Sequence, residues 1–195
     1  MFKGGFENPE TKLAKKIYPN VDTIDEAQKI QQFKTNGSNG AAILLYEFAN
    51  GKGADIRNFH YDFDITQQFL ANNRIAEIKN EFFVQLSKKG LTYNQFIDNN
   101  VMVRGGYSFS PDHTTIIDSA EKHVKANFVQ FVVGGANIEF YPDNDYGWIN
   151  VIIWNPMSRN SFLLHQADSY QRDGSGNNLP LSTIRQNFIF KLKVL

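Results

Sequence analysis

The C-terminal segment from Ser182 to Leu195 restricts the fold more than any other part of the chain. Apolar and polar side chains alternate along it, with Ile184, Phe188, Phe190 and Leu192 set against Arg185, Asn187 and Lys191. An alternation of period two indicates a β-strand with one buried face and one solvated face. We therefore expect the last seventy residues to form an antiparallel sheet with one wet side.

Two earlier segments are expected to supply the neighbouring strands. Residues 127–141, "NFVQFVVGGANIEFY", predict one long strand, and its first half is apolar on both faces, which favours a central place in the sheet. "PDNDYG" predicts a turn, and residues 148–154, "WINVIIW", predict the returning strand. After Pro156 the segment "SFLLHQ" is expected to continue this strand.

The first hundred residues read mainly as helices. Thr23 and Glu26 form a capping-box pattern at the start of one helix, which is expected to end near residues 35–40. The apolar run at residues 41–53 predicts a short buried helix, with a strand as the alternative. Further helices are predicted over residues 65–89 (stopped by Gly90), 92–98 and 110–126, and residues 101–109 predict a strand in which Gly105 and Gly106 mark a bulge or a close approach.

The predicted fold class is α+β, with N-terminal helices packed on a C-terminal antiparallel sheet. Residues 1–20 combine Gly, Pro and Asn and are expected to form an arm or linker, which leaves residues 21–195 as a single domain.

Composition narrows the function classes. The 20 basic and 20 acidic residues cancel, which disfavours a broad nucleic-acid footprint but leaves a local basic patch open. Without cysteine there is no disulfide, thiolate nucleophile or cysteine zinc site. No apolar run approaches the roughly 18 residues of a membrane helix, and "MFKGGFENPE" lacks the apolar core of a signal peptide. If the domain is exported, another part of a larger protein or a secretion system is expected to export it.

The strongest catalytic candidates are histidines. His165 and His123 are candidate general bases, and Arg159 is a candidate anion stabiliser. On one regular strand Arg159 and His165 would lie roughly 20 Å apart, so they meet one substrate only if the chain folds back. The alternative is a polar strand entry with a structural role. The spacing of His113 and His123 does not suit a metal, and we expect neither a metal site nor a cofactor.

Two groups are binding candidates. His60, Tyr61, Asp62 and Asp64 cluster in an expected loop, where the alternative is that "YDFD" caps the next helix. Trp148 and Trp154, together with Tyr141 and Tyr146, predict a recognition surface or a membrane-inserting hairpin formed by "FVQFVVGGANIEFY" and "WINVIIW". The alternative is that the apolar residues of these two segments belong to the core.

Several segments together resemble a known family. "LLYEFANGKGADIRNF", "TQQF", "YSFSPD", "EKHVKANFVQFVVGGANIEF" and "NPMSRNSFLLH" look like the C-terminal domain that follows the repeat region of large secreted RHS-type (YD-repeat) proteins. The resemblance spans roughly Ala41 to Leu195. It implies a secreted bacterial effector or toxin tip, released from a repeat-built parent shell and paired with a cognate immunity protein, and it implies no particular reaction.

Three hypotheses follow. The first is a secreted effector or toxin domain, with histidine-dependent hydrolytic or transfer chemistry if it is an enzyme. The second is a non-enzymatic binding or membrane-active module. The third is a structural piece of the larger secreted assembly.

Overall fold

The computed structural model describes residues 8–71, 74–107, 128–133, 136–158, 170–174 and 178–195. Its centre is a five-stranded sheet in the order β1-β5-β4-β3-β2. The strands are β1 (Ile56–His60), β2 (Val103–Tyr107), β3 (Ala136–Pro142), β4 (Trp148–Met157) and β5 (Ile184–Lys193). The described helices are α1 (Pro9–Ile17), α2 (Glu26–Thr35), α3 (Gly37–Asn50), α4 (Asp64–Phe69), α5 (Arg74–Lys88), α6 (Tyr93–Asp98) and α8 (Phe128–Val133).

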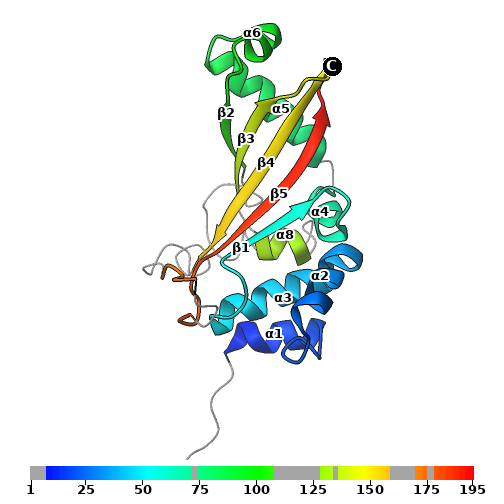
Figure 1. Ribbon diagram of the computed structural model, residues 1–195, viewed down its shortest axis with the longest axis vertical. Helices are drawn as coiled ribbons and strands as arrows, with labels where there is room; N and C mark the ends of the chain where they lie inside the picture. Colours follow the sequence, from blue (N-terminus) through cyan, green and yellow to red (C-terminus); the bar gives the residue numbers. More distant parts are fainter. Residues whose placement is uncertain (1–7, 72–73, 108–127, 134–135, 159–169, 175–177) are drawn as a thin grey trace, which may run out of the picture.

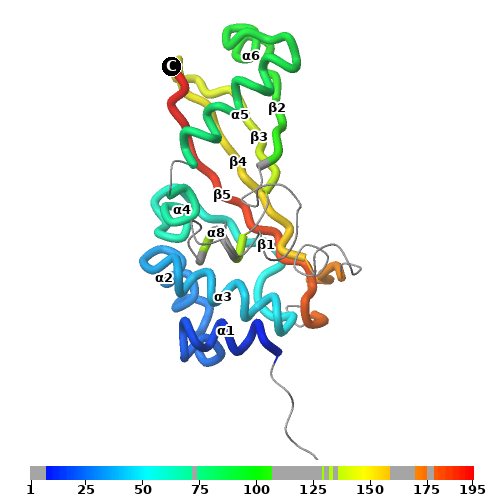
Figure 2. The backbone as a smooth tube through the Cα atoms, turned by 180° about the vertical axis from the view of Figure 1, so that it is seen from behind, coloured from blue at the N-terminus to red at the C-terminus, as the bar shows by residue number. Residues whose placement is uncertain are grey.

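The helices gather on one side of the sheet. Helix α5 runs behind the long strands in Figure 1 and in front of them in Figure 2, while α1, α2 and α3 stack beyond their lower ends. The α+β class, with helices mostly N-terminal and strands mostly C-terminal, is confirmed.

The sheet is antiparallel except at one edge. β2, β3, β4 and β5 pair antiparallel in sequence order, whereas β1 lies parallel to β5, from Ile56 opposite Arg185 to His60 opposite Ile189. β1 and β5 are far apart in the chain, so no tight hairpin forces them to run antiparallel.

Aromatic side chains on the inner face of the sheet hold the two layers together. Phe188 of β5 is fully buried, stacks on Phe69 of α4 at 4.1 Å between ring centroids, and meets Phe59 of β1 at 5.2 Å. Towards the other edge, Phe82 of α5 meets Phe140 of β3 edge-on at 5.3 Å. Offset and edge-on aromatic pairs add to the free energy of burial, so these contacts fix where the helices lie on the sheet.

Several predicted elements are confirmed. The run predicted as a helix over residues 41–53 is helical up to Asn50 within α3, and Gly51 caps the helix in the left-handed conformation (φ 63°). A Cβ atom at residue 51 would lie 2.0 Å from the carbonyl oxygen of Asn178, so glycine is required there. Thr92 and Gln95 form the predicted capping box of α6. The period-two burial of β5 is also observed.

Helix α2 starts two residues later than predicted. Its N-cap is Asp25, which forms a capping box with Gln28, and not Thr23 with Glu26. The Thr23 hydroxyl instead donates to the carbonyl oxygen of Asn20 at 3.0 Å within a turn. Both patterns satisfy the spacing rule, and the one that directly precedes the helix forms the cap.

The prediction of one long strand over residues 127–141 is wrong. Phe128–Val133 form helix α8, and β3 begins only at Ala136. Val129, Val132 and Val133 are buried at helical spacing. A short apolar run has no periodicity that separates a buried strand from a buried helix, which is why the pattern misled.

The predicted helix over residues 65–89 is two helices. α4 ends at Phe69 and α5 begins at Arg74, and the sequence between them contains Asn72 and Asn73, which have low helix propensity. The two helices pack on different partners, α4 against α3 and α5 against β2. One straight helix would not reach both.

The expected irregular arm over residues 1–20 is wrong for Pro9–Ile17, which form α1 against α3. The Asn8 side chain caps this helix, and Pro9 occupies its first position, where proline favours a helix start.

β2 pairs with β3 without a bulge, and Gly105 is instead the place where the strand closely approaches the Glu81 side chain. The predicted helix at 110–126 and the strand continuation at 161–166 lie outside the described residues.

Replacing Phe188 with alanine tests the aromatic core. Because Phe188 is fully buried between two rings, Phe188→Ala should lower the free energy of unfolding by about 3–5 kcal/mol. Ile189→Ala, its neighbour on the opposite face of β5, should cost about 1 kcal/mol or less. Urea denaturation of both variants measures this, and equal losses would contradict the assignment of the two faces.

Candidate binding site on the outer face of the sheet

The outer face is the side of the sheet opposite the described helices. Its side chains alternate with the buried ones along each strand, as Arg185 and Asn187 do on β5 and Trp154 does on β4. Within the described strands the charged side chains on this face are Arg104, Arg185, Lys191, Lys193 and Glu139. The strands therefore present more basic than acidic side chains on this face, although Lys191 is paired with Asp143 next to β3 and Arg104 with Glu139.

Trp154 lies in a row of amide side chains that crosses the sheet. It pairs with Asn137 of β3 on one side and with Asn187 of β5 on the other. Asn187 in turn pairs with Asn58 of β1 and donates a hydrogen bond from Nδ2 to its Oδ1 at 2.8 Å. The register of the sheet thus places hydrogen-bonding groups on both sides of the indole ring.

Arg185 covers Trp154. The centre of its guanidinium group lies 4.8 Å from the centroid of the ring, and its Nε donates to Asn187 Oδ1 at 3.0 Å. A cation over an aromatic ring is attracted by about 0.5–1 kcal/mol at an exposed site. The indole Nε1 is buried and has no acceptor among the described residues.

Arg104 and Glu139 form an ion pair beside this row. The two side chains approach to 3.2 Å, with Arg104 69% exposed and Glu139 12% exposed. Tyr141 donates its hydroxyl proton to Glu139 Oε2 at 2.7 Å. This hydrogen bond, together with partial burial, raises the pKa of Tyr141, so the phenol stays protonated at neutral pH. Glu139 therefore has two partners, and most of the Arg104 side chain stays exposed.

These side chains surround a hollow of about 390 Å³, which has the size of a small-ligand pocket. Four adjacent strands contribute to it. Its polar and aromatic lining consists of Arg104, Asn137, Glu139, Trp154 and Arg185. An aromatic ring, two guanidinium groups and an amide can together hold a planar group that carries negative charge.

The aromatic candidates from the sequence separate in the structure. Trp154 lines the hollow, whereas Trp148 lies on the same face six residues earlier on β4 and does not. Tyr141 contacts the site through Glu139. Tyr146 is 74% exposed in the turn before β4. The core alternative applies to Ile149, Val151 and Ile153, which face inward between the two tryptophans.

The candidates at residues 60–64 do not converge on one point. The exposed His60 ring meets Phe63 edge-on at 5.8 Å, and the Tyr61 ring lies 6.3 Å from Phe190. Asp62 is exposed. Asp64 instead accepts hydrogen bonds from the backbone N–H of Gly37 at 2.6 Å and from the Gln68 side chain at 2.8 Å, which ties α4 to the start of α3.

The three catalytic candidates, His123, Arg159 and His165, lie outside the described residues, and so does His113. His60 is therefore the histidine that the structure places, at the end of the edge strand β1. Among the residues described, no group of three or more His, Cys, Asp or Glu side chains is arranged to hold a metal ion. None of the helices described has the length and apolar character to cross a membrane.

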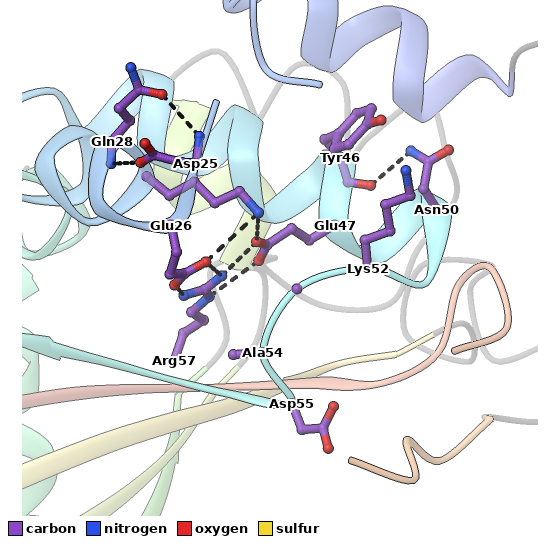
Figure 3. A network of polar contacts seen from close by, with 12 residues as sticks. Asp25, Glu26, Gln28, Tyr46, Glu47, Asn50, Lys52, Ala54, Asp55 and Arg57 are labelled. Carbon is purple, nitrogen blue, oxygen red and sulfur yellow. Dashed lines mark hydrogen bonds and ion pairs between the residues drawn. The ribbon is translucent and has the colours of Figure 1, made fainter. Parts of the chain in front are cut away.

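A buried ionic network joins α2, α3 and β1 (Figure 3). Glu47 of α3 is fully buried. Its Oε1 atom forms ion pairs with Lys29 Nζ at 2.9 Å and with Arg57 Nη2 at 2.5 Å. Arg57 also pairs with Glu26. Burial disfavours the charge on Arg57, but its contacts with Glu26 and Glu47 outweigh burial and raise its pKa. A Cβ atom at Gly53 would lie 2.1 Å from the Glu47 carboxyl carbon, so the chain closes tightly over the pair.

The sequence patterns predicted neither this network nor most of the residues that line the hollow. The available signal for the network was Glu47 itself, a charged residue inside the apolar run "AAILLYEFA". Arg104, Asn137 and Glu139 gave no local signal, because they meet Trp154 only through strand register.

No protein-family model matches the chain, and no significant match was found to any curated protein or solved structure. The functional inference therefore rests on the geometry of the outer face.

Replacing Glu47 with glutamine should be strongly destabilising. Glu47→Gln leaves Arg57 and Lys29 facing a neutral amide inside the protein, and losing one partner of a buried pair typically costs about 3–5 kcal/mol. Glu26→Gln removes a partly exposed partner of the same arginine and should cost about 1 kcal/mol or less. Chemical denaturation compares the two, and a near-neutral Glu47→Gln variant would contradict the structural importance of the network.

Acid should remove the contribution of Glu26. Its hydrogen bond from Arg57 holds the pKa of Glu26 below the ordinary value of 4.5 in the folded state. A lowered pKa stabilises the fold above the unfolded-state pKa, and this stabilisation is lost as the pH falls. The difference in unfolding free energy between wild type and Glu26→Gln should therefore shrink below pH 4.5. Urea titrations at several pH values test this, and a constant difference would show that Glu26 does not couple to folding.

Proposed function

We propose that the chain is a non-enzymatic binding domain that takes its ligand in the hollow around Trp154. One observation carries the proposal: an aromatic ring, two guanidinium groups and an amide, from four separate strands, line one hollow on the basic face of the sheet. Binding sites typically combine such a cavity with a few convergent polar groups.

The sheet supports this role because it is rigid. The inner sides of β3, β4 and β5 are packed into the core through Phe140, Val151 and Phe188, so the outer side chains hold fixed spacing. A preorganised site pays less entropy on binding. Trp154 itself is not needed for the core, since it faces away from it.

The lining favours a ligand with a planar group and a negative charge. The ring of Trp154 offers a stacking surface, and Arg104 and Arg185 offer planar donor groups that suit carboxylates and phosphates. Glu139 offsets one of these two cations through its ion pair with Arg104, so the lining keeps one positive charge in excess.

A catalytic role finds less support on this face. The carboxylate in the hollow is held by two partners, and His60 lies at the end of β1, outside the lining. Histidine-dependent chemistry through His123 and His165, with Arg159, stays a hypothesis from the sequence.

The secreted effector role is a second proposal, and it rests on the resemblance to the tips of RHS-type proteins. In that setting the outer face would be the surface that contacts the target, and an immunity protein would act by covering it. Induced expression in a bacterial host, with and without an export signal, tests the effector role: growth arrest that Trp154→Ala abolishes supports both proposals, and normal growth in both compartments contradicts the effector role.

The two tryptophans allow a direct test of the binding role. The chain contains only Trp148 and Trp154, so its ¹H–¹⁵N spectrum carries two indole signals, which Trp148→Phe and Trp154→Phe assign. We expect at least one pool of candidate ligands (nucleotides, acidic sugars, neutral sugars or acidic peptides) to shift the Trp154 signal while the Trp148 signal stays in place. If no pool moves the Trp154 signal at millimolar concentration, the hollow is not a small-ligand site and the proposal fails.

A further inference from the structure

We infer that the ligand of the hollow is a nucleotide unit, with its base stacked on Trp154 and the phosphate groups on either side of the base held by Arg104 and Arg185. This inference rests on the proposed binding role and names the class of ligand. The same chemistry is present in a free mononucleotide and in one unit of a single-stranded nucleic acid.

Stacking comes first. The guanidinium centre of Arg185 lies over Trp154, 4.8 Å from the ring centroid, so this face of the ring is open to a partner from outside the sheet core. Arg185 is exposed and is held by the attraction to the ring and by one solvent-exposed hydrogen bond to Asn187, so a base can replace it on the ring at modest cost. Bases stack on aromatic side chains regardless of their sequence, and this contact is a main source of affinity for single strands.

Once it has left the ring, the guanidinium group of Arg185 is available to bind phosphate. Arg185 lies on β5 and Arg104 on β2, so the two cations flank the hollow from opposite sides of Trp154. Guanidinium groups bind phosphate oxygens through paired, charge-assisted hydrogen bonds. Arg104 is largely exposed and keeps donor groups free beyond its contact with Glu139, since an arginine carries five N–H donors.

The amide row supplies the polar contacts of a base. Asn137 and Asn187 stand directly beside Trp154 in the register of the sheet, one on each side. The Asn137 amide lines the hollow and offers both donors and an acceptor, which match the mixed edge of a nucleobase. The Asn187 amide already donates to Asn58 and accepts from Arg185. A neutral sugar would also use the ring and the amides, but it would leave both guanidinium groups without an anion.

The size and charge of the hollow fit one nucleotide unit and do not fit a duplex. The hollow of about 390 Å³ has room for a single small ligand. The hollow is lined by two arginines and one glutamate, in a chain with no net charge, which suits few phosphate contacts. Two such contacts with a single strand predict that log K falls with log salt with a slope of about −1.4.

The test is binding of defined probes to the full chain. Fluorescence anisotropy with short labelled oligodeoxythymidylate and oligouridylate, and NMR titration with adenosine and uridine monophosphate, cover the two sources. Binding of the monophosphates as tight as that of the oligonucleotides identifies a free nucleotide as the ligand, and binding of the oligonucleotides alone identifies a strand.

Variants separate the site from the rest of the protein. Trp154→Ala and Arg185→Ala should each weaken binding by about tenfold or more, because they remove the stacking surface and a phosphate contact. Trp154→Phe keeps an aromatic ring and should retain most of the affinity, which also guards against a misfolded alanine variant. Trp148→Phe and Lys193→Ala lie on the same face outside the hollow and should bind like the wild type.

The failures are distinguishable. If a sugar or peptide pool shifts the Trp154 signal and no nucleotide probe binds, the nucleotide inference is overturned and the binding role stands. If nucleotides bind but Trp154→Ala binds equally well, the inference is overturned because the site lies elsewhere. If no pool of any class affects Trp154, both proposals fail together.

Discussion

The packing of β5 is the constraint on which the rest of the structure depends. This strand lies between the parallel edge strand β1 and the antiparallel set of β4, β3 and β2. Its inner side carries Phe188, around which the rings of β1 and α4 gather, and its outer side carries Arg185 and Asn187. One alternating strand therefore anchors the helical layer and, through the same backbone, spaces the side chains of the outer face.

Elements whose structure follows from a local sequence pattern were predicted correctly. The sequence alone predicted the alternation of β5, the capping box at Thr92 and the helix within residues 41–53. Residues 128–133 were not, because six apolar residues fit a buried strand as well as a helix. The break between α4 and α5 also escaped prediction, since it follows from two different packing partners and not from the hydrophobic spacing.

The residues of the candidate site were harder to predict from local patterns than the elements of the fold. Trp154 was expected to form part of a recognition surface, and the structure puts it on the outer face. Its neighbours Arg104 and Asn137 lie on strands that are distant in the sequence, and only the register of the sheet brings them together. The buried Glu47–Arg57 pair likewise joins a helix to a strand. Such long-range polar pairs have no fixed spacing in a sequence, so pattern analysis does not find them.

The place of β5 in the chain also has a consequence for how the domain assembles. β1 and the helices before it appear early, and the hairpin of β3 and β4 appears later, but these two pieces pair with each other only through β5, which follows them all. Until β5 has been synthesised, β1 therefore has none of the described strands to pair with. The row from Asn58 to Asn137 is complete only once β5 has joined the sheet, because Asn187 of β5 lies between Asn58 and Trp154.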